Sequence, residues 1–151
     1  MSALKPTDFL ERESVVLGLR AGDKSALMNA VARRAANRLK LSVAAVAAPL
    51  LAREALGSTG IGRGIALPHA RIANLPRPFG LLARLEKPVD FAAIDDEPVD
   101  LVFLLLTPEN AGREHLAALA AISRVLRDEA VARRLRAARD AGEIYACFES
   151  G

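Results

Sequence analysis

Six consecutive apolar residues, Leu101–Leu106, place the tightest constraint on what this chain can fold into. A strand with one buried face alternates apolar and polar residues, whereas an unbroken apolar run is typical of a central strand covered on both faces. Thr107-Pro108 follows the run and is expected to stop the strand. Helices are predicted both before and after the strands, so we expect a three-layer α/β/α sandwich with a mixed central sheet.

The other elements are predicted from periodicity and capping residues. Apolar residues at every fourth position predict a helix over Asp23–Leu39, and Ser42 can cap a second helix that ends near Leu56. Pro49 lies inside that second helix and is expected to kink it. The remaining predictions are strands over Val15–Leu19 and Phe79–Leu85 and helices over Arg113–Leu126, Glu129–Ala138 and Ile144–Phe148.

Composition excludes several classes of protein. The 151 residues fit one domain spanning 1–151, and 52% hydrophobic with 26% charged residues indicates a globular chain. A net charge of +3 is too small to predict nucleic-acid binding. One cysteine and two histidines exclude a cysteine-based zinc finger, so neither a metal nor a cofactor is expected. The longest apolar run, Val43–Ala52, is half of what a bilayer needs, and the first residues lack the apolar core of a signal peptide. We expect a cytoplasmic protein without membrane insertion.

The segment G-S-T-G-I-G-R-G-I-A-L-P-H-A-R (57–71) differs in kind from the rest of the chain. It is not a P-loop, because no lysine occurs between Lys40 and Lys87. It is not a dinucleotide fingerprint either, because the third glycine position is filled by Ile65 or Leu67, depending on the starting glycine. The segment is predicted to be a loop followed by a brief extended piece over Ile65–Leu67.

A histidine beside a glycine loop is the arrangement that a phosphohistidine carrier needs. The neutral imidazole of His69 is a nucleophile, and backbone N–H groups of a glycine loop can form an anion-binding nest. We therefore predict that His69 accepts a phosphoryl group. The predicted phosphate-binding residues are two hydroxyl donors and three glycines of the same loop, namely Ser58, Thr59, Gly60, Gly62 and Gly64.

Segment L-L-A-R-E-A-L-G-S-T-G-I-G-R-G-I-A-L-P-H (50–69) resembles the signature of fructose/mannitol-type enzyme IIA domains of the bacterial phosphotransferase system. Two segments, G-S-T-G-I-G (57–62) and F-A-A-I-D-D-E-P-V-D-L (91–101), are similar to sequences of the nitrogen-regulatory branch in particular. The resemblance implies an α/β/α fold and phosphorylation of His69, at Nε2, by an HPr-like carrier (NPr). It also implies that Arg53 and His115 are the family's active-site arginine and second active-site histidine.

Plainer structural roles remain open for several residues. His115 begins a helical stripe with Leu119, Ile122 and Leu126, so it points inward and could be a core histidine. Arg53 could only offset the dipole of its helix. The acidic run over 90–100 is read as a polar turn rather than a metal site. The arginines over 124–139 are read as a solvated helix face, and a patch that docks an acidic partner stays open.

Two functional classes compete. In the first, the protein regulates kinases, transporters or other partners through its phosphorylation state, which changes its charge by about 1.5–2 units. In the alternative, it is a sugar-specific relay that passes phosphate to a IIB domain. We favour regulation, and we regard the protein as a phosphoryl-transfer relay component more than a turnover enzyme. Nucleic-acid binding through the arginines is a third, weakly supported class.

Overall fold

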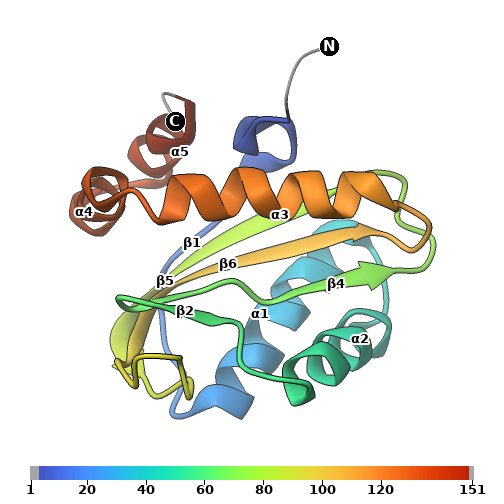
Figure 1. The fold of residues 1–151 in the computed structure, drawn as a ribbon, viewed down its shortest axis with the longest axis horizontal. Helices are drawn as coiled ribbons and strands as arrows, with labels where there is room; N and C mark the ends of the chain where they lie inside the picture. Colours follow the sequence, from blue (N-terminus) through green and yellow to red (C-terminus); the bar gives the residue numbers. More distant parts are fainter. Residues whose placement is uncertain (1–3, 150–151) are drawn as a thin grey trace.

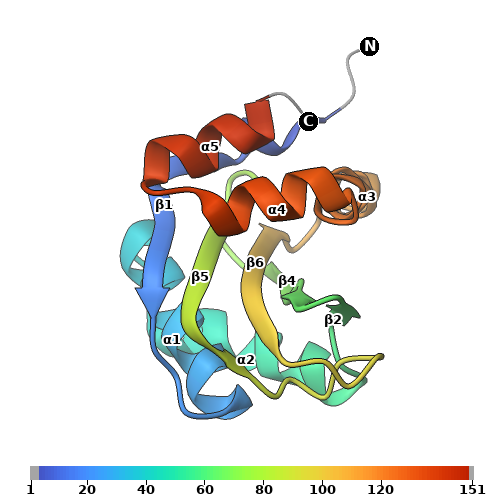
Figure 2. The ribbon, with the colours of Figure 1, turned by 90° about the vertical axis from the view of Figure 1, so that its left-hand side faces the viewer.

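A six-stranded sheet lies between two layers of helices in this computed structural model, which describes residues 4–149 (Figures 1 and 2). The strands are β1 (Leu10–Leu19), β2 (Gly60–Gly62), β3 (Ile65–Ala66), β4 (His69–Ile72), β5 (Phe79–Val89) and β6 (Val99–Pro108). The helices are α1 (Lys24–Leu39), α2 (Val43–Ala55), α3 (Arg113–Leu126), α4 (Glu129–Ala137) and α5 (Ala141–Glu149), with a 3₁₀ turn, η1, over Pro6–Asp8.

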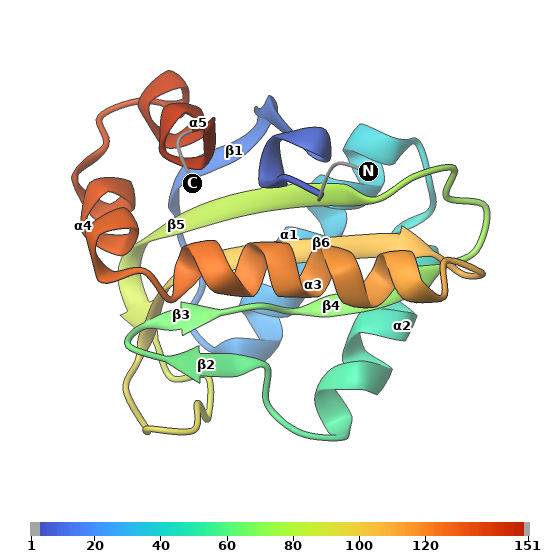
Figure 3. The ribbon, with the colours of Figure 1, turned by 45° about the horizontal axis from the view of Figure 1, so that its top comes forward.

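The sheet is mixed, as expected. Its order is β1-β5-β6-β3-β2, with β4 also paired to β6. β5 runs parallel to β1 and antiparallel to β6, whereas β3 and β4 both run parallel to β6. β3 and β4 therefore lie in line along one edge of β6, beneath α3 (Figure 3). The glycine-rich segment thus supplies the strands on one side of β6, with β2 paired outside β3.

Strand β6 is covered on both faces, which confirms the reading of its apolar run. Leu104 and Leu106 pack into the core under α1 and α2, whereas Phe103 and Leu105 pack into a second core under α3, α4 and α5. All four side chains are fully buried. The three-layer α/β/α sandwich is confirmed. Within residues 4–149, no helix has the length and apolar character that crossing a membrane requires.

The expectation that Thr107-Pro108 ends the strand is corrected. Strand β6 does not stop before Thr107-Pro108 but includes both residues. Pro108 has no N–H to donate, and the carbonyl of Ile72 instead accepts a hydrogen bond from the N–H of Glu109, at 3.1 Å. Helix α2 continues through Pro49 over its full length. Its predicted cap is confirmed, because Ser42 Oγ accepts from Ala45 N at 3.1 Å.

Candidate functional site

His69 is the first residue of β4, opposite Leu105 on the central strand. Its half-buried ring is held by a hydrogen bond of 2.9 Å between Nδ1 and the carbonyl oxygen of Leu67. A carbonyl oxygen only accepts, so Nδ1 carries the hydrogen and donates it. In the neutral ring the lone pair is then on Nε2. The structure thus supplies what the residues alone left open, namely which nitrogen can act as a nucleophile.

The surroundings of His69 favour its neutral form. Burial lowers the pKa of His69 below its ordinary value of 6.5, and the positive charge of Arg53 lowers it further. The hydrogen bond to Leu67 and the negative charge of Glu54 act in the opposite direction, raising the pKa, but they do not overcome burial. Because the net shift is downward, the ring is mainly uncharged at neutral pH and Nε2 keeps its lone pair.

His115 lies next to His69, so the structure brings two of the predicted site residues together. It sits in the first turn of α3, is 9% exposed, and its ring centroid lies 5.8 Å from that of His69. Its Nδ1 is 2.5 Å from Oγ1 of Thr107, which is fully buried and has no other acceptor within residues 4–149. The hydroxyl therefore donates to Nδ1, which leaves the ring hydrogen on Nε2. Burial, Arg71 and His69 together lower the pKa of His115.

Arg71 is a candidate site residue that the sequence analysis did not assign. Ala70 and Ile72 pack into the core beneath α1 and α2, so the alternation of β4 places His69 and Arg71 on the opposite face, under α3. Arg71 is exposed, and its charge acts on His115. The sequence could have identified Arg71 by its position two residues after His69, because alternate residues of an extended segment lie on the same face.

Arg53 lies in the last turn of α2, where its Nη1 donates to the carbonyl oxygen of Gly57 at 3.0 Å. A guanidinium has five N–H donors, so this contact leaves others for an anion. Its charge is one of the causes that lower the pKa of His69. Arg53 at the end of α2 and His69 at the beginning of β4 thus act on one another although they are sixteen positions apart in the sequence.

The hydroxyl donors of the glycine loop are used inside the protein. Ser58 Oγ donates to the carbonyl oxygen of Phe91 at 3.0 Å and accepts from Gly60 N at 3.1 Å. Thr59 donates through both its N–H, at 2.9 Å, and its hydroxyl to the carboxylate of Glu54. The hydroxyls of Ser58 and Thr59 and the N–H groups of Thr59 and Gly60 therefore have partners inside the protein, and they hold the loop in shape.

Gly62 and Gly64 are not brought to His69. β3 begins opposite Leu101 and β4 begins opposite Leu105, a separation of ~13 Å along the strand at 3.3 Å per residue. A Cβ on Gly64 would lie 2.7 Å from Nη2 of Arg136, and a Cβ on Gly62 would lie 3.2 Å from Oδ2 of Asp95. Both glycines have positive φ and form the tip of the β2–β3 hairpin, so their role is in the turn.

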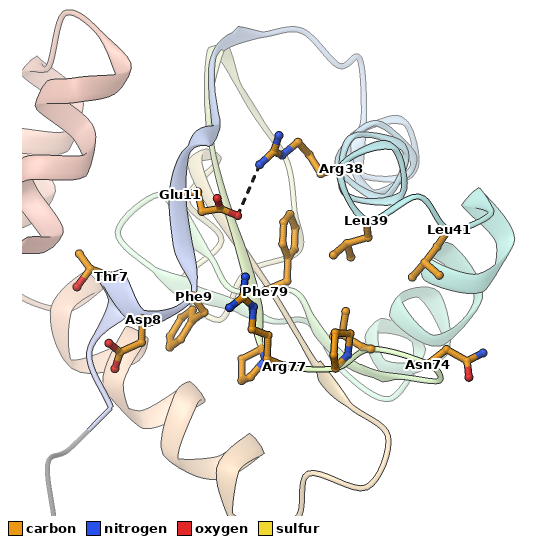
Figure 4. Close-up of a pocket in the computed structure, with 13 residues that line it drawn as sticks. Thr7, Asp8, Phe9, Glu11, Arg38, Leu39, Leu41, Asn74, Arg77 and Phe79 are labelled. Atoms are coloured by element: carbon orange, nitrogen blue, oxygen red, sulfur yellow. Dashed lines mark ion pairs between the residues drawn. The ribbon is translucent and has the colours of Figure 1, made fainter.

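Other sequence features lie outside this site. Arg63, at the hairpin tip, forms an ion pair with Glu129 of α4. Asp95 accepts from the N–H groups of Arg63 and Glu97, as in a polar turn. Residues 4–149 hold no cluster of three His, Cys, Asp or Glu side chains that could bind a metal. A cleft of about 420 Å³ beside Arg38, Arg77 and Phe79 contains none of the predicted site residues (Figure 4).

Replacing Thr107 with valine tests the orientation of His115. Thr107→Val keeps the shape of the buried side chain but removes the donor to Nδ1, so the ring should lose its single tautomer. We expect about 1 kcal/mol of lost stability, read from urea unfolding. The tautomer itself is measured by ¹⁵N NMR of the imidazole nitrogens. Thr7→Val, which removes a hydroxyl from the 3₁₀ turn η1 ahead of β1, should leave the His115 signals unchanged; equal spectra for both variants would contradict the assignment.

Comparison with known proteins places these features in a family. Residues 8–151 match the model of the phosphoenolpyruvate-dependent sugar phosphotransferase system, EIIA 2. The chain is 46% identical over 139 residues to a nitrogen regulatory protein of Bradyrhizobium diazoefficiens, covering 92% of this chain and 91% of that one. It is 37% identical over 145 residues to a nitrogen regulatory protein of Escherichia coli K12, covering 95% and 89%.

A solved structure agrees with the family match. The crystal structure of the nitrogen regulatory protein IIA-Ntr from Neisseria meningitidis superposes with a TM-score of 0.88 at 36% identity, covering 93% of this chain and 97% of that one. The expected resemblance is therefore confirmed in both sequence and fold. The chain belongs to the EIIA type-2 family of the phosphotransferase system, on its nitrogen-regulatory branch.

Proposed function

We propose that this protein is a phosphohistidine carrier that accepts a phosphoryl group on Nε2 of His69 from an HPr-like carrier (NPr). The observation that carries the proposal is the pair of facing histidines, His69 and His115, with ring centroids 5.8 Å apart. Hydrogen bonds at Nδ1 of each ring leave both Nε2 atoms for the phosphoryl group. One Nε2 supplies the lone pair and the other supplies an N–H donor.

The transfer needs little beyond positioning and charge. The lone pair on Nε2 of His69 forms the new N–P bond while the donor's N–P bond breaks, and its electron pair returns to the donor imidazole. The positive charges of Arg53 and Arg71 oppose the negative charge on the phosphoryl oxygens. His115 donates through Nε2–H to one of those oxygens. No proton has to leave Nε2 of neutral His69, because that atom carries none.

The consequence for the cell is a change of surface charge. Phosphorylation adds about 1.5–2 negative charges where the guanidinium groups of Arg53 and Arg71 supply local positive charge. Leu116, which is 64% exposed, follows His115 directly in the first turn of α3 and provides an apolar contact beside the charged site. We therefore propose that partners in the cytoplasm, such as kinases or transporters, distinguish the two states at this surface.

Phosphoryl transfer from phosphoenolpyruvate through purified phosphotransferase enzymes tests the proposal. The nitrogen-type donor chain should label the protein with an alkali-stable, acid-labile phosphate, as expected of a phosphohistidine. The sugar-type donor chain, run in parallel, measures specificity. Failure of both chains to label the folded protein would overturn the proposal. Efficient onward transfer to a IIB cysteine would favour the sugar-relay alternative over regulation.

The pH dependence of labelling follows from the lowered pKa of His69. The neutral ring is the nucleophile, and a group with a depressed pKa stays neutral to lower pH. Single-turnover labelling by a fixed amount of phosphorylated carrier should therefore stay constant below pH 6.5 and fall only as the pH drops through the lowered pKa. Direct titration of His69 by NMR is the control. A rate that follows an unshifted imidazole would contradict the burial argument.

A further inference from the structure

Glu54 is a buried carboxylate beside the site that no step of the transfer uses. It is 9% exposed, in the last turn of α2, directly after Arg53. Its two oxygens accept from the N–H and the hydroxyl of Thr59, and Oε2 lies 2.8 Å from Nζ of Lys24. A buried charge is costly unless it is paired and hydrogen-bonded, and these three donors meet that requirement.

A continuous chain of hydrogen bonds leads from this carboxylate to the nucleophile. Glu54 holds Thr59 through its N–H and its hydroxyl, and the carbonyl oxygen of Thr59 accepts from Leu67 N at 2.9 Å. The carbonyl oxygen of the same Leu67 accepts from Nδ1 of His69 at 2.9 Å. Thr59 and Leu67 are thus the two residues that link Glu54 to the imidazole of His69, and the bond from Leu67 sets its tautomer. A displacement of Thr59 would therefore move Leu67 and change the orientation of the His69 imidazole ring.

The same anchor joins four separate segments around the loop. Lys24, which pairs with Glu54, begins α1, and its Nζ lies 4.5 Å from the ring centroid of Phe91. The carbonyl oxygen of Phe91 in turn accepts from Ser58 Oγ. The start of α1 and the glycine loop therefore meet the end of α2 at one carboxylate, and the segment before β6 is linked to both through Lys24 and Ser58. This cross-linking explains how a loop with several glycines keeps one conformation.

We propose that Glu54 is a positioning residue for phosphoryl transfer at His69, fixing the glycine loop through Thr59 and orienting the imidazole through Leu67. The proposal rests on the proposed function and names the residue that prepares its nucleophile. Glu54 does not touch the phosphoryl group. Its role is to keep Nε2 at a fixed direction and distance relative to Arg53 and His115.

A second, electrostatic effect gives this role its own signature. The negative charge of Glu54 raises the pKa of His69 against the opposing effects of burial and Arg53. The neighbouring rings and charges that also act here are His115 and, through His115, Arg71. Removing the charge of Glu54 should therefore make His69 a weaker base, which a purely structural contact would not do.

Three variants test the proposal. Glu54→Gln keeps the size of the side chain but removes its charge, so we expect a lower His69 pKa by NMR, a displaced Thr59 amide signal and labelling slowed roughly tenfold to a hundredfold. Thr59→Val removes the hydroxyl and keeps the charge, so labelling should slow without a fall in the His69 pKa. Glu143→Gln removes a carboxylate of α5 that pairs with Arg139, and should change none of these measurements.

The outcomes separate the two proposals. If the wild-type protein is not labelled by either donor chain, the proposed function fails, while the NMR titration still tests the link between Glu54 and His69. If the wild type is labelled and Glu54→Gln matches it in rate and in the His69 pKa, the positioning role is overturned. Should Glu54→Gln fail to fold, Thr59→Val decides: the loop is then held to Glu54 by the N–H of Thr59 alone, and labelling at the wild-type rate would overturn the claim that both bonds to Glu54 position His69.

Discussion

His69→Ala is expected to lower phosphoryl acceptance to background, on the order of a thousandfold or more below wild type. The reason is that in the proposed transfer Nε2 of His69 forms the bond to phosphorus, and the other histidine, His115, is a poor substitute. Its Nδ1 accepts from Thr107, which leaves Nε2 protonated in the neutral ring. The measurement is labelling from the nitrogen-type donor chain at equal protein concentrations, with circular dichroism confirming that the variant is folded.

His115→Ala is the matched control for this experiment. The variant keeps the nucleophile and loses one donor to the phosphoryl oxygens, so labelling should persist but slow by about a hundredfold. The two variants together separate the acceptor from its neighbour. Full labelling of His69→Ala, or loss of labelling only in His115→Ala, would reverse the assigned roles and move the phosphoryl group to the other ring.

The layers of the fold could be predicted because they depend on local patterns. The apolar run Leu101–Leu106 and the helical periods fixed which residues are buried, and burial decides the layers. The boundaries were harder, because pairing with a neighbour extends strands beyond their apolar part. β1 begins at Leu10, five residues before the predicted start, and β6 continues through Pro108. Such extensions depend on tertiary partners that a single segment does not show.

Sequence reasoning selected the histidine of the candidate site, whereas it did not find the hydrogen-bond partners of the glycine loop. Sequence reasoning placed His69 beside free donors, because loop hydroxyls and amides without visible partners look available. The partners of those groups come from distant segments: Phe91 for Ser58 and the helical Glu54 for Thr59. Only the folded chain shows that these donors are occupied. Arg71 was missed for the opposite reason, since its relation to the site depends on the alternation of a short strand.

Because β6 is buried on both faces, we expect truncation of two adjacent residues of this strand to destabilise the protein by similar amounts. Phe103 faces α3–α5, where its ring centroid lies 6.4 Å from that of Phe9 and 5.7 Å from that of Phe148. Leu104 faces α1 and α2. Removing either side chain leaves a cavity in a fully buried layer, so Phe103→Ala and Leu104→Ala should each lower the free energy of unfolding by about 3–5 kcal/mol.

The experiment is urea unfolding followed by circular dichroism, with Leu56→Ala as the control. Leu56 is 85% exposed at the end of α2, so its truncation should change the free energy of unfolding by no more than about 0.5 kcal/mol. If only one face of β6 were buried, one of the two substitutions in β6 would cost as little stability as Leu56→Ala. That result would contradict the three-layer architecture, because two helical layers require both faces of β6 to contribute to stability.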